Sequence, residues 1–321
     1  MDIRAALMLS AIALFALLLL YKEGLLKKPA PVVTALLLTA AAFILRALVF
    51  DYETLDYQNF LSQWVEFFRQ HGGFRALRYP VGNYNIPYLY FMALFSYSSV
   101  YDLYLIKLLS TFFDLLLAYA VLRLVSRWSK SVWLRLCCFF TVLLWPTVFL
   151  NSAVWGQCDS IYVALALLGI DAALDERPIL SMCCIALSFG FKLQAVFIMP
   201  VYAVLWMQGK LKWYHFLVFP GVYVLLVLPA VLAGRPFMDT ITLYLSQTGS
   251  IGSGIAEQGR KLREQCRGEI FGEGKDPEQR ENVRRVEIAV MHMRQQEGDT
   301  HGKQHGGGKW MQGKLKWYHF L

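Results

Sequence analysis

Long apolar runs constrain the fold of this chain more than any other feature of its sequence. Residues 5–21 carry no charged side chain, and residues 31–50 carry only Arg46. About 20 apolar residues in a helix suffice to cross the hydrocarbon layer of a bilayer. Inside that layer every backbone polar group must be satisfied within the protein, which favours helices. We therefore expect an all-α, polytopic membrane protein.

The charge balance supports a membrane protein over a soluble one. Of the 321 residues, 57% are hydrophobic and only 17% are charged, whereas soluble proteins average about 25% charged residues. The formal net charge is +8, and much of the excess lies in short links between apolar runs. Such a distribution predicts the orientation of the spans and not the binding of a nucleic acid.

The apolar runs predict about eight transmembrane or half-membrane helices. The basic links at residues 22–28, 123–135 and 209–215 are predicted to be cytoplasmic, which places the polar segments 51–87 and 151–160 together on the outer face. Residues 86–100 are too short to span and predict an interfacial helix within a first outer loop, 51–100. The expected helices cover residues 5–20, 31–50, 102–124, 134–150, 161–174, 179–191, 195–207 and 216–233.

The character of the chain changes after residue 250. Residues 1–250 are predicted to form the membrane-embedded region, and residues 251–309 are polar, glycine-rich and predicted to be disordered. Residues 310–321 then repeat residues 206–217 letter for letter. A perfect recurrence without a fixed period indicates a frameshifted or chimeric reading frame, with a natural duplication as the alternative.

The first outer loop carries the best candidates for acid–base chemistry. Asp56 follows the second predicted helix, where a carboxylate at the water–lipid boundary can accept a proton from a hydroxyl group. A solvated loop acid or a helix cap is the competing interpretation. Asp51 and Glu53 fit either the same role or the binding of a divalent cation. The cysteine and histidine spacings indicate no metal site.

The segment NSAVWGQCDS, residues 151–160, begins where one predicted helix ends and stops where the next begins. Asp159 is expected at a helix N-terminus, where backbone N–H groups and the helix dipole favour a carboxylate. A helix-capping role alone would explain an aspartate at that position. The functional interpretation adds Trp155 as a platform for a sugar ring or lipid and Gln157 as a hydrogen-bonding partner.

Three charges lie within apolar surroundings. Lys107 and Asp114 are two helical turns apart and share a face of the third predicted span, where charges usually face a cavity or a partner. An interhelical structural pair is the alternative. Lys192, with Gln194 beside it, stands between two short apolar segments; its ammonium suits a phosphate, or it snorkels to the interface. Arg46 is interpreted as an interfacial anchor.

Together these motifs resemble a known family. DYxxFLxxW in the first loop, GNYNIPYLY, WGQCDSIY and FKLQA, spread over residues 51–250, are similar to the bacterial GT-C class polytopic glycosyltransferases, akin to the GPI mannosyltransferase II family. The resemblance implies transfer of a hexose, often mannose, from a polyprenyl-phosphate donor to a lipid or glycan acceptor outside the membrane. It implies Asp56, then Asp51, as catalytic base and Tyr57, Asp159 and Lys192 as site residues.

The family is longer than this chain, so the resemblance also implies a truncated or frameshifted member. The sequence lacks a nucleotide-binding motif, which favours a lipid-linked donor and no organic cofactor. The expected setting is a cell membrane, with a bacterial inner membrane favoured. Two alternatives stay open. One is a transporter or flippase lined by Lys107, Asp114 and Lys192; the other is an inactive fragment of the transferase.

Overall fold

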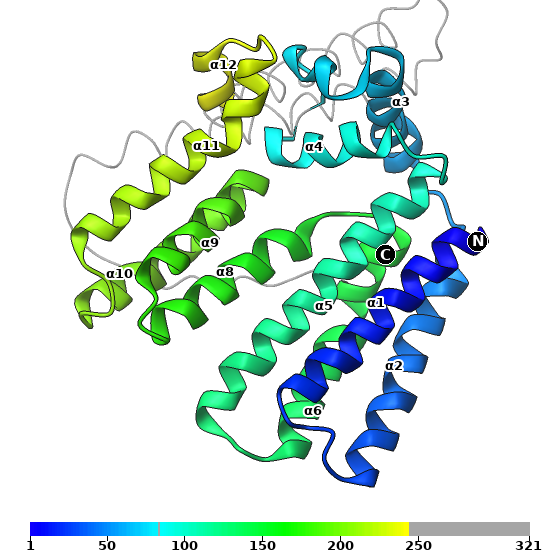
Figure 1. Ribbon diagram of the computed structural model, residues 1–321, viewed down its shortest axis with the longest axis vertical. Coiled ribbons are helices and arrows are strands. Elements are labelled where there is room, and N and C mark those ends of the chain that lie inside the picture. The colour runs from blue at the N-terminus through cyan, green and yellow to red at the C-terminus, as the bar shows by residue number, and fades with distance from the viewer. Residues whose placement is uncertain (83, 244–321) are drawn as a thin grey trace, which may run out of the picture. The chain divides into compact units, whose positions relative to one another are not determined.

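The computed structural model of the chain describes residues 1–82 and 84–243. Over these residues the chain forms helices and connecting turns without strands (Figure 1), which confirms the all-α prediction. The predictions for residues 251–309 and 310–321 lie outside the described residues.

Four of the described helices are long and apolar enough to cross a membrane. They are α1 (Ile3–Lys22), α2 (Pro29–Val49), α5 (Asp102–Trp128) and the segment Trp213–Leu232, which contains α11 (Val218–Leu232). A fifth is possible by length if α6 (Val132–Leu144) and the segment Pro146–Val154 act as one span bent by 45°. The membrane character predicted from the apolar runs is therefore confirmed.

The remaining predicted segments form shorter helices. They are α4 (Ile86–Phe95), α8 (Asp159–Leu174), α9 (Pro178–Phe191) and α10 (Met199–Met207), with a 3-10 turn Leu193–Ile198 before α10. Pro178 begins α9 and Pro200 lies in the first turn of α10, where a missing N–H is tolerated. A short α12 (Phe237–Ile241) ends the described chain.

The first outer loop is largely helical and is not an extended connector. A π-helical turn, Tyr57–Leu61, continues directly into α3 (Ser62–Gln70), and a 3-10 turn, Gly73–Arg78, follows. Helix α3 is amphipathic and buries Trp64, Val65 and Phe68. Its apolar stripe needs a partner to be stable, and α4 provides one.

Helix α4 ends at Phe95, before the predicted end at residue 100, and most of its surface is covered by protein. Seven of its ten residues are buried, including Tyr88, Leu89 and Met92. It packs against α3, α9 and α11, and it lies near the top of the view in Figure 1. The Asn85 side chain caps its first turn, accepting from the N–H of Ile86 at 2.9 Å, and donates to Tyr223 of α11.

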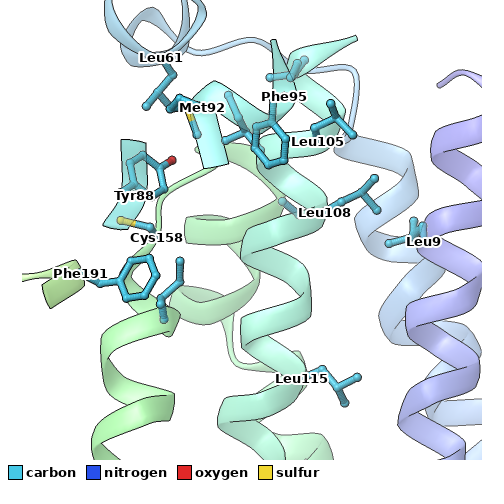
Figure 2. Packing of buried hydrophobic residues seen from close by; sticks show 14 of the residues in the cluster. Leu9, Leu61, Tyr88, Met92, Phe95, Leu105, Leu108, Leu115, Cys158 and Phe191 are labelled. Atoms are coloured by element: carbon cyan, nitrogen blue, oxygen red, sulfur yellow. The ribbon is translucent and has the colours of Figure 1, made fainter. Parts of the chain in front are cut away.

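One apolar core joins α1, α4, α5, the start of α8 and the end of α9. Figure 2 shows Leu105 and Leu108 of α5 between Leu9 on one side and Met92 and Phe95 of α4 on the other. Tyr88, Cys158 and Phe191 lie together at the edge of this core. The polar segments that follow α7 (Pro146–Phe149) and α9 are thus anchored on buried side chains.

The polar contacts between different segments are concentrated at two ends of the helices. At the polar-loop end, the N-terminal ammonium and Tyr104 both donate to Asp51, at 3.0 and 2.7 Å, and Arg4 donates to Ser99 at 2.6 Å. These contacts join the start of α1, the first outer loop and the start of α5. The side of the membrane that this end faces stays a prediction from the basic links.

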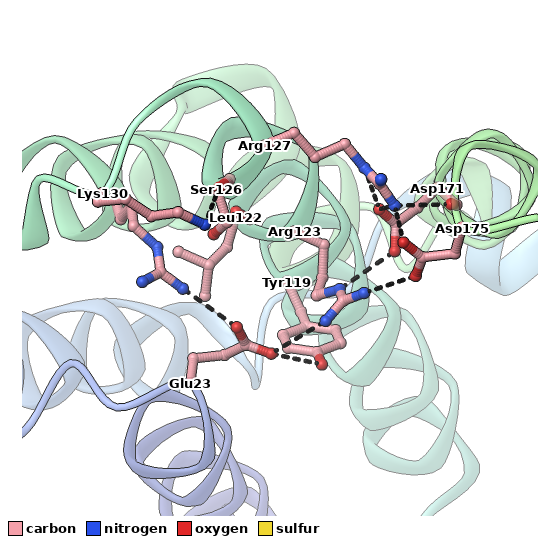
Figure 3. A network of polar contacts seen from close by, with 10 residues as sticks. Glu23, Tyr119, Leu122, Arg123, Ser126, Arg127, Lys130, Asp171 and Asp175 are labelled. Carbon is pink, nitrogen blue, oxygen red and sulfur yellow. Dashed lines mark hydrogen bonds and ion pairs between the residues drawn. The ribbon is translucent and has the colours of Figure 1, made fainter.

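The opposite end, called the basic end, is held by the ion pairs drawn in Figure 3. Arg123 and Arg127 of α5 bridge to Asp171 of α8 and to Asp175, the residue after that helix, at 2.5 to 3.1 Å. Glu23, after α1, accepts from Tyr119 at 3.0 Å and from Arg135 of α6 at 3.1 Å. The three basic links and the acidic turn after α8 therefore belong to one end, since Lys210 also pairs with Glu176 at 3.3 Å.

The ion pair of Asp175 predicts a dependence of stability on acid. The hydrogen bond from Arg127 lowers the pKa of Asp175 below its usual 3.8. The pair therefore stabilises the fold fully above 3.8, and this contribution is lost as the pH falls through the lowered pKa. Asp175→Asn should lower stability by about 0.5–1 kcal/mol at pH 6, and the difference from wild type should shrink as the pH falls below 3.8. Thermal unfolding in detergent measures both.

Glu176→Gln is the matched control, because Glu176 is adjacent, 81% exposed and paired only loosely with Lys210. It should unfold like the wild type at each pH. A deficit of Asp175→Asn that stays constant down to pH 3 would contradict the prediction.

Candidate functional site

The carboxylate of Asp56 is held by a side chain from the turn before α8. Gln157 Nε2 donates to Asp56 Oδ2 at 2.5 Å, across 101 positions of sequence. The hydroxyl of Tyr84, at the end of the first outer loop, donates to Gln157 Oε1 at 2.9 Å. Because Tyr84 occupies the amide oxygen, the amide N–H₂ group is the part of Gln157 that faces Asp56.

Burial keeps Tyr84 a neutral donor. It raises the pKa of the Tyr84 hydroxyl well above its usual range, and the nearby charges of Asp159 and Asp56 raise it further. A neutral hydroxyl donating to an amide, and the amide donating to a carboxylate, form one directed chain. This chain fixes one oxygen of Asp56 and leaves the other without a hydrogen bond among the contacts of the described residues.

A second polar pair lies two residues along the same turn. Asp159 is the first residue of α8, as predicted, and forms an ion pair with Lys192. Asn151 Nδ2 donates to the same carboxylate at 3.2 Å. Lys192 follows the end of α9 in extended conformation, with its ammonium 6.0 Å from the centre of the Tyr162 ring.

The turn between these pairs is fixed by close packing. Gly156 has φ +66°, and a Cβ atom there would lie 3.2 Å from Ile106 of α5, so a larger residue would be strained and crowded. Cys158 is 1% exposed, and burial raises the pKa of its thiol to about 12. It is therefore a neutral core residue, beside Tyr88 and Phe191 (Figure 2).

The structure thus brings four of the predicted residues together, namely Asp56, Gln157, Asp159 and Lys192. With Tyr84 they form what we call the acid–lysine cluster. The Lys192–Asp159 pair is partly open, with side-chain exposures of 20% and 40%. A partly exposed ion pair contributes only about 0–1 kcal/mol, so a stronger anion can displace Asp159 from Lys192.

Other predicted residues lie outside this cluster. Trp155 and Gln194 are exposed. Tyr57 is 3% exposed and packs edge-to-face on Tyr101 at 6.1 Å. Asp51 is bound by Tyr104 and the N-terminus, and the hydrogen bond from Tyr104 lowers its pKa.

Lys107 is fully buried and bonds to the end of α2. Its ammonium donates to the carbonyl oxygens of Val49, Phe50 and Tyr52, at 3.1, 3.0 and 2.6 Å. The last carbonyl groups of a helix lack partners within it, and a cation satisfies them and complements the helix dipole. This contact anchors the start of the loop that carries Asp56.

Asp114 is fully buried and binds three side chains. Arg46 of α2 donates to it at 2.8 Å, and the hydroxyls of Ser152 and Ser160 donate at 2.5 Å each. These serines stand on either side of the turn that carries Gln157 and Asp159. The expectation that Arg46 is an interfacial anchor is wrong, because its side chain is 0% exposed and its charge is compensated inside the protein.

Sequence reasoning missed Tyr84, Asn151, Ser152 and Ser160. Asn151 and both serines belong to NSAVWGQCDS, whose density of small polar residues between two apolar runs was the available signal. Tyr84 lies in GNYNIP, next to the Asn85 cap, and its partner is a glutamine 73 positions away. Nothing local predicts that contact.

Within residues 1–82 and 84–243, no group of three or more His, Cys, Asp or Glu side chains has the arrangement of a metal site. No family model, curated protein or solved structure matches the chain. The family resemblance therefore stays a prediction from the sequence motifs.

Proposed function

We propose that the chain is a membrane-embedded glycosyltransferase that transfers a hexose from a polyprenyl-phosphate sugar to a hydroxyl of a lipid or glycan acceptor. One observation carries the proposal. An acid held in a fixed orientation, Asp56, and a partly open ammonium, Lys192, are joined by the short turn from Gln157 to Asp159. A base and a phosphate-binding cation on one face are what such a transfer needs.

In the proposed reaction the acceptor oxygen attacks the anomeric carbon of the donor. Asp56 takes the hydroxyl proton through the carboxylate oxygen that Gln157 leaves free. The bond between the anomeric carbon and the phosphate oxygen breaks, and its electron pair leaves with the polyprenyl phosphate. Lys192 turns from Asp159 to the departing phosphate and stabilises its charge. The N-terminus of α8 adds favourable N–H dipoles at that position.

The predicted orientation in the membrane, the donor cavity and the identity of the sugar are part of the same proposal. The basic end is assigned to the cytoplasm by its lysines and arginines, and the acid–lysine cluster to the outer face of a bacterial inner membrane. The short helices α8, α9 and α10 would line the cavity for the donor, where spans of less than full length are tolerated. Mannose is the first sugar to test.

The alternative of a transporter finds less support in the contacts. Lys107 and Asp114 would have to face an aqueous path, but both side chains are fully buried and bonded to protein partners. Only Lys192 among the three charges is partly exposed.

Membranes that contain the full chain, supplied with radiolabelled polyprenyl-phosphate mannose or glucose, test the proposal. We expect label to move into an extractable glycolipid or glycan. Absence of transfer from both donors in the presence of total membrane acceptors would contradict the proposal, and accumulation of a solute without a glycan product would favour the transporter.

Lys192 gives a sharper prediction within that assay. Lys192→Gln should lower kcat/KM for the donor by about 10- to 100-fold, since a hydrogen bond to a charged group contributes about 1.5–3 kcal/mol. Lys192→Arg keeps the charge and should recover part of the loss. The measurement is initial rate against donor concentration at saturating acceptor.

Lys210→Gln is the matched control, because it also removes a lysine from an ion pair, here with Glu176 at the basic end. It should transfer sugar at the wild-type rate. Equal effects of the two glutamine variants would show that lost charge alone, and not its position, lowers activity.

A further inference from the structure

An open recess of about 650 Å³ lies beside the segment that carries Asp56. Its wall includes Glu53, Tyr57 and Gln58 from the first outer loop, and Tyr101 and Asp102 from the start of α5. Helix α3 contributes the residues Ser62, Gln63, Glu66, Phe67, Arg69 and Gln70 to the lining. We call it the α3 recess.

Hydrogen-bond donors and acceptors lie next to one another in the lining of the recess. Gln58 and Tyr101 both donate to Glu53, at 2.9 and 2.7 Å. On α3, Arg69 and Gln70 both donate to Glu66, at 2.5 and 2.9 Å. Amide, phenol, guanidinium and carboxylate groups are thus presented side by side. A ligand whose groups both donate and accept can replace these contacts one for one, and hydroxyl groups do so.

The charges and the aromatic surface of the recess restrict the class of ligand further. Three carboxylates, of Glu53, Glu66 and Asp102, stand against one guanidinium, that of Arg69, which disfavours an anionic ligand. Tyr101 is 43% exposed and turns an aromatic surface to solvent. An aromatic face beside carboxylates and amides combines apolar contact with hydrogen bonding, which suits the C–H face and the hydroxyls of a sugar ring.

The recess also shares backbone with the proposed base. Asp56 directly precedes Tyr57 and Gln58, and these two residues begin the π-helical turn Tyr57–Leu61. Adjacent residues are about 3.8 Å apart along the backbone, and π-helical turns are frequent at functional sites. A glycan in the recess would therefore contact the two residues that directly follow Asp56 in the chain.

We infer that the α3 recess binds an uncharged glycan and that this glycan is the acceptor of the transfer, an inference that rests on the proposed function for the acceptor role. In the proposed function the donor phosphate binds at Lys192, which is not among the residues that line the recess. The recess gives the acceptor its specificity through α3 and Tyr101.

Binding of neutral glycans to the purified full chain in detergent tests the inference without any donor or turnover. The probes are fluorescently labelled di- to tetrasaccharides of mannose, glucose, galactose and N-acetylglucosamine, with amine-bearing and uronic-acid counterparts, measured by fluorescence anisotropy. At least one neutral probe should bind. Tyr101→Ala and Gln63→Ala should each weaken that binding by about tenfold, whereas Asn59→Ala should leave it unchanged.

Gln63 and Asn59 are both exposed polar residues of the same helical segment, but only Gln63 lines the recess. Gln63→Ala therefore keeps the test valid if Tyr101→Ala fails to fold. Binding of no neutral probe, binding of charged probes only, or equal effects of Gln63→Ala and Asn59→Ala would each overturn the inference.

The transfer assay separates this inference from the proposed function. Asp56→Asn should bind the neutral probe like the wild type while losing turnover, and Gln63→Ala should raise KM for the acceptor without changing KM for the donor. Glycan binding without any sugar transfer would remove the acceptor role and leave a glycan site. Transfer with unchanged acceptor KM in Gln63→Ala would overturn the inference and leave the transferase standing.

Discussion

Asp56→Asn is expected to lower sugar transfer by about 10²- to 10⁴-fold, the range for loss of a general base. Asparagine has the shape of aspartate and keeps an oxygen that can accept from Gln157 Nε2, which is 2.5 Å from Asp56 Oδ2. The chain from Tyr84 through Gln157 would persist, so the loss is one of proton acceptance and not of structure. The measurement is kcat with saturating donor and acceptor in matched membranes.

Asp51→Asn is the control, because it changes an acid of the same loop. Asp51 is 62% exposed and bound to the N-terminus and Tyr104, and the proposed reaction does not use it. Its transfer rate should stay within about threefold of wild type. If Asp51→Asn lost as much activity as Asp56→Asn, or if Asp56→Asn stayed active, the base would have to be sought elsewhere in the loop.

Much of the helical framework could be predicted from the sequence because burial in lipid leaves a local signal. The uncharged run at residues 5–21 became α1, and the run beginning at Pro31 became α2, starting at Pro29. The helix beginning at Asp159 was also predictable, since an acid directly before an apolar run marks a helix N-terminus. The lengths of the membrane-embedded helices were harder to predict. Helices α8, α9 and α10 are short and pack against neighbouring segments, and no local sequence pattern identifies those neighbours.

The candidate site was predictable only as separate pieces. Each polar segment stands out against its apolar surroundings, which is why Asp56, Gln157, Asp159 and Lys192 could be named. Their pairing could not be predicted, because contacts such as that of Gln157 with Asp56 span 101 positions. Arg46 shows the limit most clearly. Its position near the end of a span suggests snorkelling, whereas its partners Asp114 on α5 and the carbonyl oxygen of Leu143 on α6 explain why it is buried.

Asp114→Leu is expected to destabilise the fold by about 3–5 kcal/mol, the range for breaking a buried ion pair by removing one partner. Arg46 would keep a charge with no exposed surface, between the rings of Phe43 and Phe149 at 6.0 and 5.6 Å. Thermal unfolding in detergent should show the loss. Glu66→Gln, which breaks a pair that is 41% and 47% exposed, should change stability by less than about 1 kcal/mol.

The double variant Arg46→Met/Asp114→Leu separates the ion pair from the packing around it. Removing both charges leaves no uncompensated ion, and apolar replacements of buried pairs are often neutral or stabilising, so the double variant should be more stable than Asp114→Leu alone. It should nevertheless lose sugar transfer, because Ser152 and Ser160 would no longer be tied to α5 at 2.5 Å and the turn bearing Gln157 would move. Additive losses of stability would contradict the first expectation, and wild-type transfer the second. The two readouts together tell whether this pair serves the bundle or the geometry of the turn.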